Sequence, residues 1–172
     1  YSIGLAGSFT VDPLPRSLGN DLTARGFEKP AFHVAPYNQI NQLGLNPKSS
    51  LGAETDILAV LLRIEDITPD LLDASRTIAD IDCTINAVAT IRENYEGTII
   101  VSNLPYPSTA EFDAHDLEQP QTGMALYHSY LSRWQNGLKD IRGLRHFNLA
   151  GLLNDEGHKK SHDARSWYLY KQ

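Results

Sequence analysis

The chain has 172 residues and a mass of 19.1 kDa; 41% of its residues are hydrophobic and 21% are charged. This composition is typical of one soluble globular domain with a sizeable core. The net charge of -6 argues against a general nucleic-acid surface, which needs a basic face. The single cysteine, Cys83, excludes an internal disulfide and a metal site built from cysteines.

Apolar runs alternate with amphipathic stretches along the chain. The runs at 2–6, 31–35, 56–64, 98–102 and 145–149 predict strands, and the stretches at 15–25, 38–43 and 123–140 predict helices. The clearest helix lies between the third and fourth strands. It is expected to begin at Thr68, as a capping residue before Pro69, and to end near Tyr95-Glu96-Gly97. Its apolar residues recur three and four positions apart and predict one buried face: Ile78, Ile81, Ile85 and Val88.

This order of elements predicts an α/β fold, a three-layer α/β/α sandwich on a five-stranded, mostly parallel, flavodoxin-like sheet. We expect residues 1–172 to form a single domain. The chain starts without a methionine, which indicates a domain excised from a longer polypeptide. It contains neither a signal peptide nor a run of about 18 apolar residues that could span a membrane. With its one cysteine, this predicts a cytoplasmic protein.

Ligands of open parallel sheets bind at the carboxyl ends of the strands. The residues expected there are Ser8 after the first strand, Asn38 after the second, Arg63 at the end of the third and Asn103 after the fourth. Their hydroxyl and amide groups suit an oxyanion or a carbonyl substrate. Arg63 either pairs with Glu65 or Asp66, or binds a phosphate or carboxylate.

Asp155 and His158 follow the fifth strand, three positions apart. They can serve as orienting acid and general base for the Ser8 hydroxyl if the two ends of the chain meet. In the alternative interpretation, Ser8 is a turn residue and the late acid and histidine lie in a solvated tail. His162 and Asp163 compete for the same roles. The other histidines lack ligand spacing, so we expect no metal and no cofactor.

The Gly7-Ser8 pair after the first strand, the five-strand order, and the late Asp155 and His158 resemble an SGNH (GDSL-type) hydrolase. The resemblance implies Ser8 as nucleophile, His158 as general base and Asp155 as its orienting acid, with Asn38 or Asn103 substituting for the oxyanion asparagine. The chain departs from the family in two places. Gly7 stands where an aspartate is usual, and "LRIED" replaces the Gly-x-Asn-Asp block after the third strand.

A second resemblance covers nearly the whole chain. The segments "AGSFTVDPL", "APYNQ", "LAVLLRIEDITPD", "NLAGLL" and "DARSWYLYKQ" are similar to the N-terminal domain of FkbH-like proteins. Those proteins join an SGNH-like region to a HAD-type domain and load a glyceryl unit onto an acyl carrier protein in polyketide-type pathways. The resemblance implies a carrier protein, a HAD-type domain and a small acyl substrate as partners.

Two hypotheses follow. In the first, the domain is an enzyme of the Ser-His-Asp type, and Ser8 carries an acyl group to water or to a carrier thiol. In the second, the domain is a non-catalytic module with a degenerate site. It positions a substrate through Arg63 and docks the carrier protein or its HAD-type partner domain; late basic residues such as Arg142 and Arg145 would form the docking patch for the carrier protein.

Overall fold

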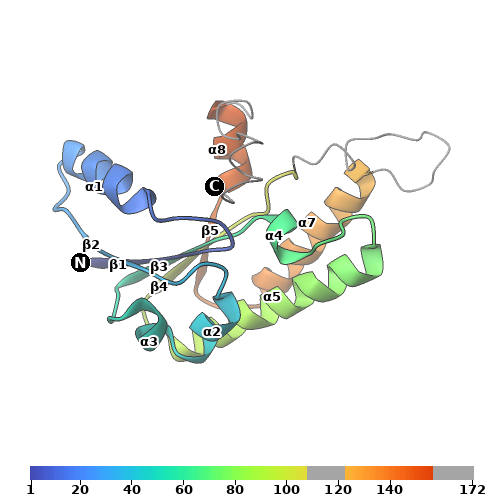
Figure 1. The fold of residues 1–172 in the computed structure, drawn as a ribbon, viewed down its shortest axis with the longest axis horizontal. Coiled ribbons are helices and arrows are strands. Elements are labelled where there is room, and N and C mark those ends of the chain that lie inside the picture. Colours follow the sequence, from blue (N-terminus) through green and yellow to red (C-terminus); the bar gives the residue numbers. More distant parts are fainter. Residues whose placement is uncertain (108–122, 157–172) are drawn as a thin grey trace.

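The computed structural model describes residues 1–107 and 123–156 of the chain (Figure 1). Within them, five parallel strands form one sheet in the order β2-β1-β3-β4-β5. The strands are β1 (Ser2–Gly7), β2 (Ala31–Val34), β3 (Ile57–Leu61), β4 (Thr98–Ser102) and β5 (Leu144–Phe147). This is the flavodoxin-like order, so the predicted α/β fold is confirmed.

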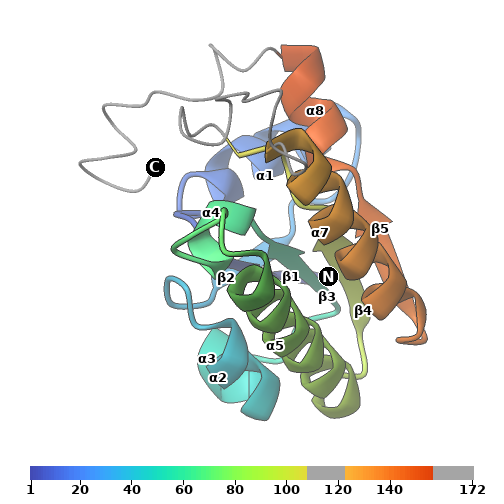
Figure 2. The same cartoon turned by 90° about the vertical axis from the view of Figure 1, so that its right-hand side faces the viewer.

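The helices that separate and follow the strands cover both faces of the sheet (Figures 1 and 2). They are α1 (Leu14–Ala24), α2 (Ile40–Leu45), α3 (Pro47–Leu51), α4 (Ile64–Ile67), α5 (Ala74–Asn94), α7 (Gly123–Lys139) and α8 (Leu149–Glu156). Within the described residues, none of these helices is long and apolar enough to cross a membrane.

The two faces are unequally covered. A large apolar cluster lies between the sheet and α2, α5 and α7, and it includes Val60, Ile99, Val88 and the fully buried Trp134. On the α1 face the cluster is much smaller, with four buried members: Ile3, Leu5, Val11 and Leu61. A parallel sheet is normally buried on both faces, and here α1 supplies the cover over β1 and its neighbours.

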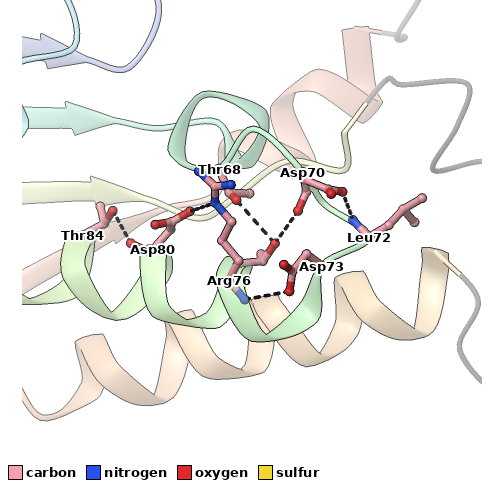
Figure 3. Close-up of polar contacts among 8 residues, drawn as sticks. Thr68, Asp70, Leu72, Asp73, Arg76, Asp80 and Thr84 are labelled. Carbon is pink, nitrogen blue, oxygen red and sulfur yellow. Dashed lines mark hydrogen bonds and ion pairs between the residues drawn. The ribbon is translucent and has the colours of Figure 1, made fainter.

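Helix α5 begins later than the sequence pattern indicates, because Asp73 caps it instead of Thr68 (Figure 3). The Asp73 carboxylate accepts a hydrogen bond from the N–H of Arg76 at 3.0 Å. Thr68 is buried, and its hydroxyl lies 3.5 Å from that of Thr77, which itself donates to the Asp70 carbonyl. The prediction that Thr68 begins the helix was therefore wrong, whereas the end at Asn94, just before Tyr95, agrees with the expected stop.

The third strand is shorter than predicted. It ends at Leu61, and the next two backbone N–H groups donate to side-chain hydroxyls instead of continuing the strand. The N–H of Leu62 donates to Ser102 Oγ at 2.9 Å, and that of Arg63 donates to Ser8 Oγ at 2.9 Å. Ile64 then starts α4. Leu62 and Ile64 are almost fully buried, which explains why the apolar run continues past the end of the strand.

Candidate functional site

The candidate site lies where the direction of the chain across the sheet reverses. From β1 the chain crosses to β2 on one side, and from β2 it returns past β1 to β3 on the other. The carboxyl ends of β1 and β3 therefore form the switch point, where flavodoxin-like folds bind ligands. Ser8 follows β1 and Arg63 follows β3, so the structure brings together these two predicted residues.

Gly7 makes the sharp turn after β1 sterically possible. A Cβ at this position would lie 2.7 Å from Val11 Cγ1 and 2.8 Å from the carbonyl oxygen of Phe9. Because contacts this short do not occur for real side chains, the turn requires glycine here. The N–H of Ser8 still donates to the Leu61 carbonyl at 3.0 Å, which ties the turn to β3.

The Ser8 hydroxyl is buried and fully engaged. Only 1% of the residue is exposed. Its Oγ donates to Asp66 Oδ2 at 3.1 Å and accepts from the N–H of Arg63 at 2.9 Å. A serine nucleophile needs a base that removes its proton and a path by which the substrate carbonyl can approach. The described residues place a carboxylate, not an imidazole, at this hydroxyl.

Arg63 is held by two partners. Its Nε lies 2.9 Å from Asp66 Oδ2, and its guanidinium carbon lies 4.8 Å from the centre of the Phe9 ring. The side chains of Arg63 and Asp66 are 13% and 4% exposed, so the pair is largely shielded from water. Of the two interpretations of Arg63, pairing with Asp66 is present. However, Nη2 is buried with no hydrogen-bond partner in the described part of the chain.

Glu65 stands next to this pair without joining it. Burial raises the pKa of its carboxyl group, and the Asp66 charge adds to this, while its own backbone N–H and the Arg63 charge act in the opposite direction. Its Oε2 is buried and, among residues 1–107 and 123–156, has no hydrogen-bond partner. The carboxyl is therefore biased toward its neutral form.

The segment after β2 forms the neighbouring wall. Tyr37 is exposed, and its pKa is raised by partial burial and by the Asp66 charge, with Arg63 lowering it, so it lies near that pair. Asn38 has a left-handed backbone with φ of 52°, a conformation that asparagine tolerates better than most residues. Its N–H donates to the Gly7 carbonyl at 3.1 Å, which places Asn38 beside the β1 turn.

Asn103 bonds to residues that follow β5. Its Nδ2 donates to Asn148 Oδ1 at 2.8 Å, and its Oδ1 accepts from the N–H of Ala150 at 2.9 Å. Asn148 Oδ1 also accepts from the N–H of Gly151. These bonds fasten the start of α8 to the end of β4, and β3 separates β4 from the strand that carries Ser8.

The predicted triad is only partly described. Asp155 lies on α8 and is exposed, in a helix rather than in the loop or tail considered from sequence. His158, His162 and Asp163 lie outside the described residues. Within residues 1–107 and 123–156, no group of three or more His, Cys, Asp or Glu side chains is arranged to hold a metal ion.

Sequence reasoning missed two members of this site. Phe9 was not singled out, although an aromatic residue directly after a strand-end serine can cover a neighbouring cation. Asp66 was considered only as a partner of Arg63, and its bond to Ser8 spans 58 positions. The three-residue spacing of Arg63 and Asp66 is the local signal that a short helix, not a strand, holds them.

Two hollows lie at the opposite edge of the sheet. They have volumes of about 450 and 670 Å³ and share Thr55, Glu96 and Gly97, before β3 and β4. This is the amino-terminal edge, which rarely carries the active site of an open α/β sheet. We therefore assign the candidate site to the switch point.

No protein-family model and no curated protein sequence matches this chain. It is similar in structure to the N-terminal part of the protein BF1531 from Bacteroides fragilis, a crystal structure described as containing a phosphatase domain complexed with Mg. The TM-score is 0.76 at 15% sequence identity, over 97% of this chain and 45% of that one. At this identity the likeness establishes the α/β fold, and this chain spans less than half the length of that protein.

Proposed function

We propose that this chain is the substrate-positioning domain of an FkbH-like enzyme and that it binds the anionic group of an acyl donor at Arg63. The observation that carries the proposal is the buried, unpaired Nη2 of Arg63 at the switch point of the sheet. Asp66 and Phe9 fix the guanidinium, so this remaining N–H group is already oriented for an oxyanion. Such preorganisation favours binding because little side-chain freedom is lost.

The engaged state of Ser8 favours positioning over acyl transfer. Its proton is donated to Asp66, and a carboxylate is a much weaker base than the imidazole of a serine hydrolase. The residue is 1% exposed, so an acyl carbonyl would reach Oγ only after the surrounding residues move, as an anion would reach the buried Nη2 of Arg63. In the proposal, Ser8 is a positioning residue that joins the ends of β1 and β3.

Two observations favour a larger enzyme. The segments "NLAGLL" and "DARSWYLYKQ" resemble the N-terminal domain of FkbH-like proteins. The structural neighbour is more than twice as long as the matched region, and its description names a phosphatase domain. We propose that a HAD-type domain and an acyl carrier protein act with this domain, and that a glyceryl or related acyl unit is the group transferred.

Binding and turnover measurements distinguish the two hypotheses. Sulfate, used as a simple oxyanion, should shift the backbone amide NMR signals around Arg63 in the wild type, and Arg63→Gln should abolish these shifts. Arg25→Gln is the matched control, because Arg25 forms an exposed pair with Asp21 on α1. In parallel, wild type and Ser8→Ala should hydrolyse p-nitrophenyl acetate at the same rate. A rate lost with Ser8→Ala would favour the catalytic hypothesis and overturn ours.

A further inference from the structure

Two side-chain atoms are buried and unpaired in the described part of the chain, and both follow β3. They are Nη2 of Arg63 and Oε2 of Glu65. Buried polar groups nearly always have a partner, so two such atoms on one short segment make it the strongest candidate for a ligand contact. Nη2 of Arg63 is always a hydrogen-bond donor. The Glu65 carboxyl group donates a hydrogen bond to an anion when it is protonated and repels the anion when it is ionised.

Arg63 Nη2 and Glu65 Oε2 do not form a hydrogen bond with each other. Arg63 directs its Nε to Asp66 and lies against Phe9, so its guanidinium is already anchored away from a full ion pair with Glu65. Asp66 is the counter-ion of Arg63, and Glu65 is a second acid beside it whose Oε2 is buried. One ionised carboxylate balances Arg63, and a second would be an uncompensated buried charge.

We propose that Glu65, in its neutral form, is the second hydrogen-bond donor of the anion site, so that binding of the anion is coupled to a proton on this residue. The inference rests on the proposed function, because it completes the site that begins at Arg63. The ligand chemistry is a group with two acceptor oxygens, either a phosphate ester or a carboxylate. One oxygen accepts from Arg63 Nη2, and the other accepts from the Glu65 carboxyl O–H.

The electrostatics of the segment support this role. Burial and the Asp66 charge keep the Glu65 carboxyl neutral to higher pH than usual, and only the Arg63 charge and the backbone N–H oppose them. After β2, Tyr37 lies near Asp66 and Arg63, and its raised pKa keeps it neutral. An arriving anion adds negative charge and so favours the protonated carboxyl further. Binding then takes up a proton wherever free Glu65 is ionised.

The test compares anion affinity across pH in three proteins. Sulfate does not titrate between pH 5 and 8, so any pH dependence belongs to the protein. For the wild type, the affinity should fall by up to about tenfold per pH unit above the pKa of Glu65, as uptake of one proton requires. Glu65→Gln, which is neutral at every pH, should bind sulfate with an affinity that does not change. Arg63→Gln should not bind.

The outcomes separate the two proposals. If the wild type binds through Arg63 with an affinity independent of pH, the role of Glu65 is overturned and the anion site stands. If Arg63→Gln binds as well as the wild type, the proposed function is overturned as well. Proton uptake by the wild type, measured by calorimetry in buffers of different ionisation enthalpy, tests the same point without a variant. Zero uptake at every pH of the titration overturns the role of Glu65, and uptake that approaches one proton over the pH range in which the affinity falls supports it.

Repeating the titration with acetate distinguishes the ligand classes. Acetate presents two oxygens in one plane, whereas sulfate has the tetrahedral geometry of a phosphate ester. Tighter binding of acetate would identify a carboxylate as the recognised group, and tighter binding of sulfate a phosphate ester. Both results support the two-donor site, and absence of both interactions in the wild type overturns it.

Discussion

The hydroxyl of Ser8 accepts a hydrogen bond from the backbone N–H of Arg63 at 2.9 Å, across the carboxyl ends of β1 and β3. The same hydroxyl donates to Asp66, which in turn holds the Arg63 side chain. One serine thus connects both ends of the short segment that carries the candidate site. The stability of the segment and the geometry of the site therefore depend on the same bonds.

We expect Ser8→Ala to destabilise the protein by about 1–3 kcal/mol, because it leaves the partly buried N–H of Arg63 without its acceptor. Urea unfolding monitored by circular dichroism measures the change. Ser2→Ala is the control, since Ser2 bonds Asp56 in an exposed position. Its effect should stay within about 0.5 kcal/mol. Equal small effects of both substitutions would show that the Ser8 hydroxyl does not hold the segment.

Asp66→Asn should lower the free energy of unfolding by more than Ser8→Ala does, by about 3 kcal/mol or above. The substitution leaves the Arg63 charge largely buried without its counter-ion. Asp82→Asn breaks another arginine–aspartate pair, with Arg133, whose side chains are 54% and 36% exposed. That pair should be worth about 0–1 kcal/mol. Unfolding free energies of the two variants at pH 7 provide the comparison. A larger loss for Asp82→Asn would contradict the role of Asp66 as the shielded counter-ion of Arg63.

Glu65→Gln should stabilise the protein at pH 8 but not at pH 4. The pKa of Glu65 is raised in the folded state, so the folded protein retains a proton that the unfolded chain has lost. Stability therefore falls as pH rises from the usual carboxyl pKa through the raised one, and a glutamine escapes this loss. Melting temperatures of both proteins across this range measure the difference.

The control for that experiment is Glu54→Gln. Glu54 is exposed, and its hydrogen bond to Lys48 lowers its pKa, so its contribution has the opposite sign. Glu54→Gln should leave the melting temperature at pH 8 unchanged or slightly lower. A gain in stability for Glu54→Gln equal to that for Glu65→Gln would indicate a general effect of negative charge instead of burial.

Gly7→Ala should destabilise the fold by about 1–3 kcal/mol or shift the β1 turn, since the added Cβ meets the Phe9 carbonyl oxygen at 2.8 Å. Gly19→Ala on α1 is the matched control. There the nearest atoms are side-chain carbons of Phe32 and Lys29 at 3.3 and 3.4 Å, and alanine favours the helix. Thermal unfolding should separate the two variants clearly, and an unaffected Gly7→Ala would remove the steric argument.

Reversing the charges of Arg142 and Arg145 should weaken carrier-protein binding without altering sulfate binding. Both residues are exposed, and they lie before and within β5, toward the edge of the sheet opposite Ser8. Surface plasmon resonance with an acidic carrier protein and the sulfate titration measure the two effects separately. Loss of sulfate binding in this double variant would place the anion site elsewhere.

The architecture was predictable from the sequence, because its strands are short apolar runs separated by helices with one apolar face. Those runs placed β1 and β4 within one residue of their observed bounds. The apolar run at 56–64 did not predict the end of β3, which lies at Leu61. Leu62 and Ile64 are buried in a turn and a short helix, and burial alone does not distinguish these from a strand. The predicted start of α5 was also wrong, because Thr68 and Asp73 are both residues that commonly cap helices.

The position of the candidate site was predictable, but its internal bonding was not. Ser8 and Arg63 each follow a strand, and strand order alone brings the two ends together. Whether Ser8 faces a histidine or an aspartate depends on how residues 58 positions apart pack, and no local pattern encodes that. The burial of Glu65 is equally non-local, because an acid beside an arginine in sequence is normally expected to be its partner.

The unequal cover of the sheet has a consequence for how the molecule opens. Helix α1 buries few side chains, whereas α5 and α7 share the large core. Local unfolding begins where the least apolar area is lost, so amides of α1 should exchange with solvent before those of α5. Phe9 and Val11 belong to the small cluster and link α1 to the β1 turn. A brief release of α1 would therefore loosen the wall around Arg63 while the rest of the protein stays folded, which gives a ligand a route of entry that requires no global unfolding.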